Sequence, residues 1–249
     1  MSKRAIVLAG GVGTRLRPYT VVLPKPLMPI GDYPILEVIV RQLVHQGFTR
    51  VTLAVNHQAE ILKAFFGDGT KWGARIDYSL ETRPMSTVAP LLLISDLPEN
   101  FLLMNGDLLT DLNLTDFLDR HIRERRLFTI AASRRLQLID YGVLQIDSAQ
   151  QLTGFTEKPQ MEYLVSMGVY AVNRSVLEYV PPDRKYGVDD LMNRLLAKGQ
   201  SVRVEPYDGY WLDIGRPDDY MRAIEEFELR KNDLLPPHDT EQMHPGNRG

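Results

Sequence analysis

A glycine-rich turn behind a short apolar strand is the feature that most constrains this chain. Residues 5–8 read Ala-Ile-Val-Leu, a continuous apolar run typical of a strand buried on both faces of a parallel sheet. Gly10, Gly11 and Gly13 follow, and glycines let a backbone turn sharply and approach a ligand closely. The N–H groups of such a turn form a concave anion site, usually for polyphosphate. The turn therefore indicates a nucleoside triphosphate site, unless it serves only as a tight connection between strand and helix.

The residues behind the turn favour phosphate binding. Arg15, Arg17 and Lys25 supply fixed positive charge there. The turn is not a P-loop, because no Gly-x-x-x-x-Gly-Lys-Ser/Thr string follows the strand. A dinucleotide-binding Gly-x-Gly-x-x-Gly pattern also fails, because Leu16 stands where the third glycine belongs.

The first half of the chain alternates short apolar strands with amphipathic segments. We expect strands at residues 51–55, 76–80, 101–105 and 128–132, and helices at residues 35–45, 59–66, 88–97 and 115–126, the last capped by Thr115 or Asp116. This rhythm predicts a parallel sheet covered by helices, with ligands at the carboxyl ends of the strands. Asp107 follows one strand and could hold a hard cation such as Mg²⁺, although Gly106-Asp107 is also an ordinary turn.

The second half is less regular and reads as antiparallel. The segments at residues 141–146 and 152–156 predict a hairpin. Further expected elements are a strand at 164–172, helices at 175–180, 189–198 and 217–230, and a strand at 202–205. We expect this half to form a lobe that packs on the first half.

Composition narrows the class of protein. At 249 residues the chain can form one large α/β domain or two small domains, and its net charge of −3 gives no support to nucleic-acid binding. It contains no cysteine, which excludes disulfides, thiolate metal sites and a cysteine nucleophile. We expect no membrane-spanning segment and no signal peptide, and hence a cytoplasmic protein.

Two strings together carry a family resemblance. Leu-Ala-Gly-Gly-Val-Gly-Thr-Arg-Leu-Arg-Pro at residues 8–18 and Pro-Lys-Pro-Leu-Met-Pro-Ile-Gly at residues 24–31 resemble the signature of the sugar-nucleotide pyrophosphorylases, or sugar-1-phosphate nucleotidyltransferases. Members join a nucleoside triphosphate to a sugar 1-phosphate and release pyrophosphate. The resemblance extends to about residue 230.

The resemblance implies an α/β fold and a division of the chain. It implies a Rossmann-like, mixed and mostly parallel sheet flanked by helices, with a smaller antiparallel sugar-binding lobe and no C-terminal β-helix. The nucleotidyltransferase domain would span residues 1–231, with the nucleotide in 1–135 and the sugar phosphate in 136–231. Residues 232–249 are polar and rich in proline and charge, and we expect a mobile tail.

The resemblance also implies roles for residues in the nucleotide half. Arg15 would neutralise the departing β- and γ-phosphates, and Lys25 would contact the α-phosphate. Asp107 and Asp213, the latter in a Trp-Leu-Asp-Ile-Gly string, would hold Mg²⁺. The implied nucleotide-binding residues are Leu8, Ala9, Gly10, Gly11, Gly13, Thr14, Glu81 and Thr87.

The implied sugar-phosphate residues lie in the second half. Lys158 would bind the phosphate and Glu157 would accept hydrogen bonds from hydroxyls, whereas without the resemblance they read as a surface ion pair. The full implied set is Tyr141, Gly142, Glu157, Lys158, Ser166 and Gly168. The chain departs from the family where Ser166 replaces an asparagine, and where Ser86 and Val88 replace a glycine and an alanine in the loop near the base.

These departures leave base and sugar open. The expected substrates are GTP and a mannose- or manno-heptose-type sugar 1-phosphate, because the chain looks most like mannose-1-phosphate guanylyltransferase-type members. The runner-up is a dTTP- or UTP-dependent glucose-1-phosphate nucleotidyltransferase. A molybdopterin guanylyltransferase, a cytidylyltransferase for a keto acid sugar and a non-catalytic nucleotide-sugar-binding subunit are further alternatives. We expect no nucleic-acid or membrane partner, and a homo-oligomer stays open.

Overall fold

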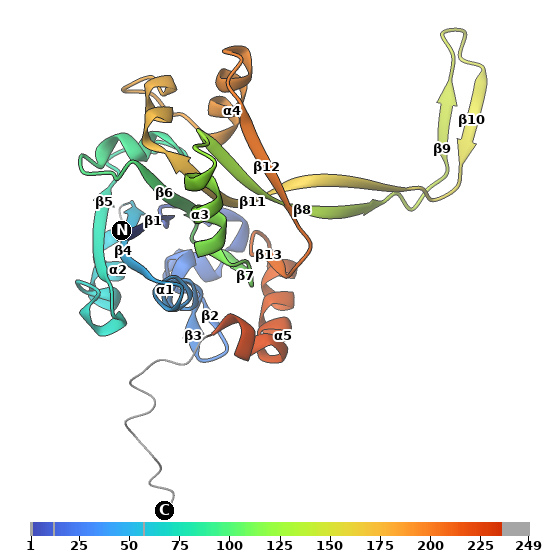
Figure 1. The fold of residues 1–249 in the computed structure, drawn as a ribbon. Coiled ribbons are helices and arrows are strands. Elements are labelled where there is room, and N and C mark those ends of the chain that lie inside the picture. The colour runs from blue at the N-terminus through green and yellow to red at the C-terminus, as the bar shows by residue number, and fades with distance from the viewer. Residues whose placement is uncertain (1, 12, 57, 236–249) are drawn as a thin grey trace, which may run out of the picture.

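The computed structural model describes residues 2–11, 13–56 and 58–235, arranged around one mixed sheet (Figure 1). Its seven strands lie in the order β12-β8-β11-β6-β1-β4-β5. Their bounds are β1 Lys3–Leu8, β4 Phe48–Val55, β5 Arg75–Leu80, β6 Asn100–Asn105, β8 Phe128–Leu138, β11 Gln160–Asn173 and β12 Val202–Tyr207. The pairs β5–β4, β4–β1, β1–β6 and β8–β12 are parallel, and only β11 runs antiparallel to its neighbours β6 and β8. The predicted mixed, mostly parallel α/β sheet is confirmed.

Helices cover both faces of this sheet. The α-helices are α1 Ile35–His45, α2 Ala59–Phe66, α3 Leu114–Arg123, α4 Val188–Ala197 and α5 Pro217–Leu234. Short 3₁₀ segments are η1 Thr14–Leu16, η2 Tyr19–Val21, η3 Lys25–Leu27, η4 Thr70–Trp72, η5 Ala89–Leu93 and η6 Arg174–Tyr179. Small two-stranded pairs are β2 Pro29–Ile30 with β3 Tyr33–Pro34, and β7 Leu108–Thr110 with β13 Trp211–Asp213. Within the described residues, no helix is both long and apolar enough to cross a membrane.

The core has two parts because successive side chains of a strand point to opposite faces. In β6, Leu102 and Met104 pack with α1 and α3 on one face. Phe101 and Leu103 pack with η5, η6 and α4 on the other. All four side chains are fully buried, so the continuous apolar run of this strand reflects burial on both sides.

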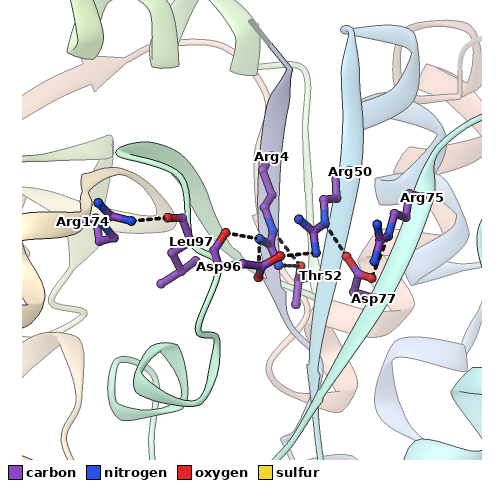
Figure 2. Close-up of polar contacts among 8 residues, drawn as sticks. All are labelled: Arg4, Arg50, Thr52, Arg75, Asp77, Asp96, Leu97 and Arg174. Carbon is purple, nitrogen blue, oxygen red and sulfur yellow. Dashed lines mark hydrogen bonds and ion pairs between the residues drawn. The ribbon is translucent and has the colours of Figure 1, made fainter.

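An ion-pair network ties the strands together near their N-terminal ends (Figure 2). Arg4 of β1 donates to Asp96 Oδ1 at 2.9 Å, and Arg50 of β4 lies 2.6 Å from Asp96 Oδ2. These hydrogen bonds lower the pKa of the Asp96 carboxyl to about 2. Asp77 of β5 pairs with both Arg50 and Arg75. The network lies at the N-terminal ends of the strands, opposite their carboxyl ends. Its ion pairs stabilise the sheet there by linking β1, β4 and β5.

The helix prediction at residues 88–97 is wrong. The segment forms only the short helix η5, because tertiary hydrogen bonds hold its backbone on either side. The N–H groups of Val88 and Ala89 both donate to Tyr186 O at 3.1 Å. Downstream, Arg4 donates to the Asp96 carbonyl and Arg174 to the Leu97 carbonyl, both at 2.9 Å (Figure 2).

Two helix ends also differ from expectation. The N-cap of α3 is Asn113, whose Oδ1 accepts from Asp116 N at 2.9 Å, and not Thr115, whose hydroxyl donates to the Gln46 carbonyl. Helix α5 runs to Leu234 with non-helical angles at Arg230, so the expected tail at 232–249 begins inside a helix. Residues 236–249 of that tail lie outside the described residues.

The predicted hairpin exists, but it does not pack on the first half. It consists of β9 Val143–Ile146 and β10 Leu152–Thr156, and Figure 1 shows it projecting far from the body. The reason is that β8 and β11, of 11 and 14 residues, stay paired beyond the sheet and carry the hairpin outward as a two-stranded ribbon. We call residues 134–164 the arm, and the rest of the described chain the body.

Candidate active site

The glycine-rich turn lies at the carboxyl ends of three neighbouring parallel strands. The Leu8 carbonyl at the end of β1 accepts from Gly106 N at 2.9 Å, and Ala9 N donates to the Ala54 carbonyl of β4 at 2.8 Å. The turn is thus held between the strands on both sides. This is the edge where ligands bind in open α/β sheets.

The glycines of the turn differ in what surrounds them. Gly13 has φ +64°, a left-handed conformation, and a Cβ there would lie 2.8 Å from Thr20 Cγ2. A Cβ on Gly10 would lie 3.0 Å from Glu81 Oε1, whereas a Cβ on Gly11 would meet no atom within 4 Å. Gly13 is therefore required by the turn itself. Gly11 exposes backbone to open space, as a phosphate site requires.

Asn56 is a residue of this site that the sequence reasoning missed. Its side-chain amide donates to the Gly10 carbonyl, and its Oδ1 accepts from Gln58 N at 3.0 Å. The contact holds the turn from the β4 side. The available signal was its position directly after a strand, the same signal that identified Asp107.

Lys25 and Asp107 form an ion pair beside the turn. Lys25 is only 7% exposed, and its Nζ contacts Asp107 Oδ2. A Cβ on Gly13 would lie 3.2 Å from Lys25 Cβ, so the lysine stem passes behind the turn. The lysine side chain therefore reaches from the glycine turn to Asp107.

Asp213 joins this pair from the far end of the chain. Strand β13 pairs antiparallel with β7, which places Asp213 opposite Leu108, and Ile214 N donates to the Asp107 carbonyl at 2.9 Å. Burial raises the pKa of Asp213 and the charge of Asp107 raises it further, against the opposing effect of Lys25 and Arg15. Two carboxylates separated by 106 positions thus share one partly buried site.

These carboxylates fit a divalent cation. Burial, and secondly the charge of Asp107, raise the pKa of Asp213, and a bound cation would offset both effects. Within the described parts of the chain, no cluster of three or more His, Cys, Asp or Glu side chains could hold a metal. Mg²⁺ would therefore take its remaining ligands from substrate phosphates and water, as it commonly does.

Arg15 lies on the same side of the site. A Cβ on Gly215 would be 3.6 Å from both terminal nitrogens of Arg15 and 3.0 Å from Asp213 Oδ2. Arg15 and its neighbour Thr14 belong to η1, which follows the left-handed Gly13 directly. The turn therefore delivers the guanidinium group toward the carboxylate pair.

The loop at residues 81–89 lies against both the turn and α4. Burial raises the pKa of Glu81, whose Oε2 accepts from Met85 N at 3.2 Å. The Thr87 hydroxyl accepts from Val188 N at 2.9 Å, which occupies it in a contact with the start of α4. Ser86 has φ +72°, which explains why a glycine suits this position.

The expected sugar-phosphate residues separate into two groups. Tyr141, Gly142, Glu157 and Lys158 gather where the ribbon meets the hairpin, and we call these four residues the elbow. There Lys158 N donates to the Tyr141 carbonyl at 3.3 Å, and a Cβ on Gly142 would lie 3.1 Å from Glu157 Oε2. The ammonium of Lys158 pairs with Asp140 at 3.0 Å. The elbow belongs to the projecting arm, away from the glycine turn (Figure 1).

Ser166 and Gly168 belong to the body instead. Strand β11 has a register shift between Ser166 and Tyr170, and Gly168 there has φ +73°. A Cβ on Gly168 would lie 2.6 Å from Asn105 Nδ2, two residues before Asp107. The Ser166 hydroxyl donates to the Tyr170 hydroxyl at 3.0 Å. These two positions therefore lie beside the end of β6 that precedes Asp107.

Known proteins resemble this chain in sequence and in fold. A "Mannose-1-phosphate guanylyltransferase catalytic subunit beta" of Drosophila pseudoobscura pseudoobscura is 33% identical over 228 residues, covering 89% of this chain and 61% of that protein. A "UTP--glucose-1-phosphate uridylyltransferase" of Synechocystis sp. is 31% identical over 241 residues, covering 89% of this chain and 62% of that protein. The crystal structure of HddC from Yersinia pseudotuberculosis has a TM-score of 0.71 at 24% identity, covering 90% of this chain and 99% of that chain.

A match to a family model agrees with the similarity of this chain to these individual proteins. The chain spans about three fifths of the length of these two curated relatives. The family model described as "Nucleotidyl transferase" matches residues 4–229, which include the glycine turn, both aspartates and the whole arm. The chain therefore belongs to the nucleotidyl transferase family.

Proposed function

We propose that this chain catalyses nucleotidyl transfer from a nucleoside triphosphate to a sugar 1-phosphate. The observation that carries the proposal is the group formed by Lys25, Asp107 and Asp213 beside the open backbone of Gly11. A buried cation, two neighbouring carboxylates and an open backbone position at Gly11 together match a reacting polyphosphate with its metal ion.

The reaction is an in-line displacement without a covalent enzyme intermediate. A phosphate oxygen of the sugar 1-phosphate forms a bond to the α-phosphorus. The bond from that phosphorus to the oxygen bridging the α- and β-phosphates breaks, and pyrophosphate leaves. The attacking oxygen is already ionised, so the site needs to position and neutralise charge more than to remove a proton.

The described residues supply these functions from defined places. The turn cradles the triphosphate, Lys25 contacts the α-phosphate, and Arg15 neutralises the leaving pyrophosphate. Mg²⁺ held by Asp107 and Asp213 would supply further neutralisation of charge on the phosphates of both substrates. Glu81, packed against Gly10, lies on the side of the turn where the base is expected.

We infer GTP and a manno-configured sugar 1-phosphate as the preferred substrates. The name of the Drosophila relative supports this choice, and so does a solved complex of HddC with GMP-PN that has a TM-score of 0.69 to this chain. The Synechocystis relative supports the runner-up, UTP or dTTP with glucose 1-phosphate.

Pyrophosphate release with Mg²⁺ tests both the proposed reaction and the proposed substrates. GTP, dTTP, UTP, CTP and ATP are crossed with a panel of manno- and gluco-configured sugar 1-phosphates. We expect the highest kcat/KM with GTP and a manno-configured acceptor. A preference for dTTP or UTP with glucose 1-phosphate would replace the substrates and keep the reaction. No release from any pair, with the protein folded and binding a nucleotide, would favour a non-catalytic subunit.

A further inference from the structure

Asn105 ends strand β6 with a side-chain amide that the proposed mechanism does not use. It is partly exposed, although its neighbours Met104 and Gly106 are buried. The amide has two N–H donors and a carbonyl acceptor. Within the described part of the chain, no group hydrogen-bonds it. Most buried polar groups in proteins have a hydrogen-bond partner, so an unpaired amide at the end of a strand in the active site is available to a ligand.

The strands on either side of Asn105 show which way the amide points. Leu8 of β1 is its register partner on one side. On the other side β11 runs antiparallel, and its pairing of Val169 with Met104 brings Gly168 opposite Asn105. The amide leans toward β11, because a Cβ on Gly168 would lie 2.6 Å from Asn105 Nδ2 but 3.5 Å from Asn105 Cβ. A glycine at position 168 therefore makes room for this amide.

The amide lies next to the expected metal-binding carboxylates. Asp107 is two residues beyond Asn105, and two residues of extended chain span at most about 7 Å. Asp213 approaches from β13, where Trp211 Nε1 donates to the Met167 carbonyl in the bulge of β11 at 2.9 Å. The ends of β6, β11 and β13 thus meet beside the amide. A sugar whose phosphate is held with a cation at these carboxylates would have hydroxyl groups within reach of it.

Ser166, which the sequence predicts to contact the sugar, is already hydrogen-bonded within the protein. Its hydroxyl donates to the Tyr170 hydroxyl at 3.0 Å and accepts from Gly168 N at 3.3 Å. A serine hydroxyl has one proton and two lone pairs, so Ser166 retains a single lone pair for a ligand. Asn105 retains both N–H donors and its carbonyl oxygen. The side chain that is free to contact the acceptor is therefore the asparagine of β6.

We propose that Asn105 is a specificity-determining residue whose amide hydrogen-bonds hydroxyl groups of the acceptor sugar. This inference rests on the proposed function, because it names a contact made by the acceptor of that reaction. An amide presents a donor and an acceptor side by side, so it pairs with hydroxyl groups in a limited set of orientations. The position of Nδ2 against Gly168, in the half of the chain expected to bind the sugar phosphate, favours the sugar over the ribose of the nucleotide.

Removing the amide and removing single sugar hydroxyls together form a double-mutant cycle. Asn105→Leu keeps a similar side-chain volume without polar atoms. Both proteins are assayed by pyrophosphate release with mannose 1-phosphate or glucose 1-phosphate, whichever the wild type prefers, and with its monodeoxy analogues. We expect Asn105→Leu to lower kcat/KM for the parent sugar 1-phosphate about 10-fold. One deoxy analogue should cost the wild type a similar factor and the variant little, while KM for the nucleoside triphosphate stays unchanged.

A matched variant separates this contact from a general effect on β6. Asn100→Leu makes the same change at the other end of the strand and should leave kcat/KM for the acceptor unchanged. Equal losses by wild type and Asn105→Leu on every deoxy analogue would overturn the proposal. A raised KM for the nucleotide alone would assign the amide to the ribose and overturn it too. Asn105→Ala gives the same comparison if the leucine variant does not fold.

Binding measurements distinguish this inference from the proposed reaction. The same sugar 1-phosphates are titrated by calorimetry with Mg²⁺ and a GTP analogue that has a methylene group between the α- and β-phosphates. Asn105→Leu should weaken sugar-phosphate binding about 10-fold and leave binding of the analogue unchanged. That loss in a protein that releases no pyrophosphate would refute the reaction and keep the contact. Equal affinities in an active protein would refute the contact and keep the reaction, and a wild type that binds neither sugar 1-phosphate would overturn both.

Discussion

Asp213 shows how one carboxylate depends on residues far away in the sequence. Its burial and the nearby charge of Asp107 raise its pKa, and the cations Lys25 and Arg15 oppose that effect. None of these three neighbours lies within 100 positions of Asp213 in the chain. The electrostatic character of the site is therefore a property of the pairing of β13 with β7.

Replacing Asp213 should affect catalysis more than folding. Asp213→Asn keeps the shape of the side chain but removes the charge that we expect to hold Mg²⁺. We expect kcat to fall by about 100-fold or more, because charge stabilisation by positioned groups is worth that much. The melting temperature should stay the same or rise, because a buried like-charge contact is removed. A near-normal kcat at saturating Mg²⁺ would contradict the metal role.

Ser86 offers a test of backbone strain in the loop near the base. Its φ of +72° is left-handed, which costs a non-glycine residue roughly 1–2 kcal/mol. Ser86→Gly should raise the free energy of unfolding by up to about 1 kcal/mol, measured in urea. Ser201→Gly, at a position outside the left-handed group, should give no gain. Equal effects of the two changes would show that strain at Ser86 is not significant.

At the scale of elements, α3 is attached to the sheet through a buried histidine. His121 Nδ1 lies 2.8 Å from Thr129 Oγ1 of β8, while its Nε2 has no hydrogen-bond partner among the described residues. Burial, and secondly the charge of Arg126, lower the pKa of His121 to about 4. The contact between α3 and β8 is therefore made by a neutral imidazole.

This histidine predicts a pH dependence of stability. Between its ordinary pKa of about 6.5 and about 4, the unfolded chain binds a proton that the folded chain does not. The free energy of unfolding should therefore fall as the pH falls from 7 to 4, by up to about 1.4 kcal/mol per pH unit from this residue.

Two matched variants separate the contribution of His121 to this pH dependence from that of other groups. His121→Gln should show a shallower fall in denaturant titrations across the same range. His45→Gln, at an exposed position, should keep the wild-type slope. If all three proteins lose stability in parallel, His121 is not the group responsible.

At the scale of the whole molecule, the two ends of the parallel strands carry different groups of residues. The ion pairs of Arg4, Arg50 and Asp96 stabilise the edge where the parallel strands begin (Figure 2). The glycine turn and the carboxylates lie where those strands end. The arm, which carries the expected acceptor residues Glu157 and Lys158, projects away from both ends of these strands (Figure 1).

Local patterns in the sequence determined much of the fold. The predicted helices at 35–45 and 59–66 agree with α1 and α2, because the spacing of apolar residues alone decides which face is buried. The strand at 101–105 lies within β6 for a similar reason. The glycine turn and its cations were evident too, since a left-handed glycine and a nearby charge are local requirements.

Only the tertiary structure decided what depends on contacts between distant segments. Hydrogen bonds across the fold bring Asp213 beside Asp107 and hold the glycine turn through Asn56. They also replace the helix expected at residues 88–97 with a short 3₁₀ segment. The direction of the arm belongs here as well. Alternating side chains predict that a hairpin forms, but its position depends on how far β8 and β11 continue beyond the sheet. That distance is set by pairing between strands and not by either strand alone.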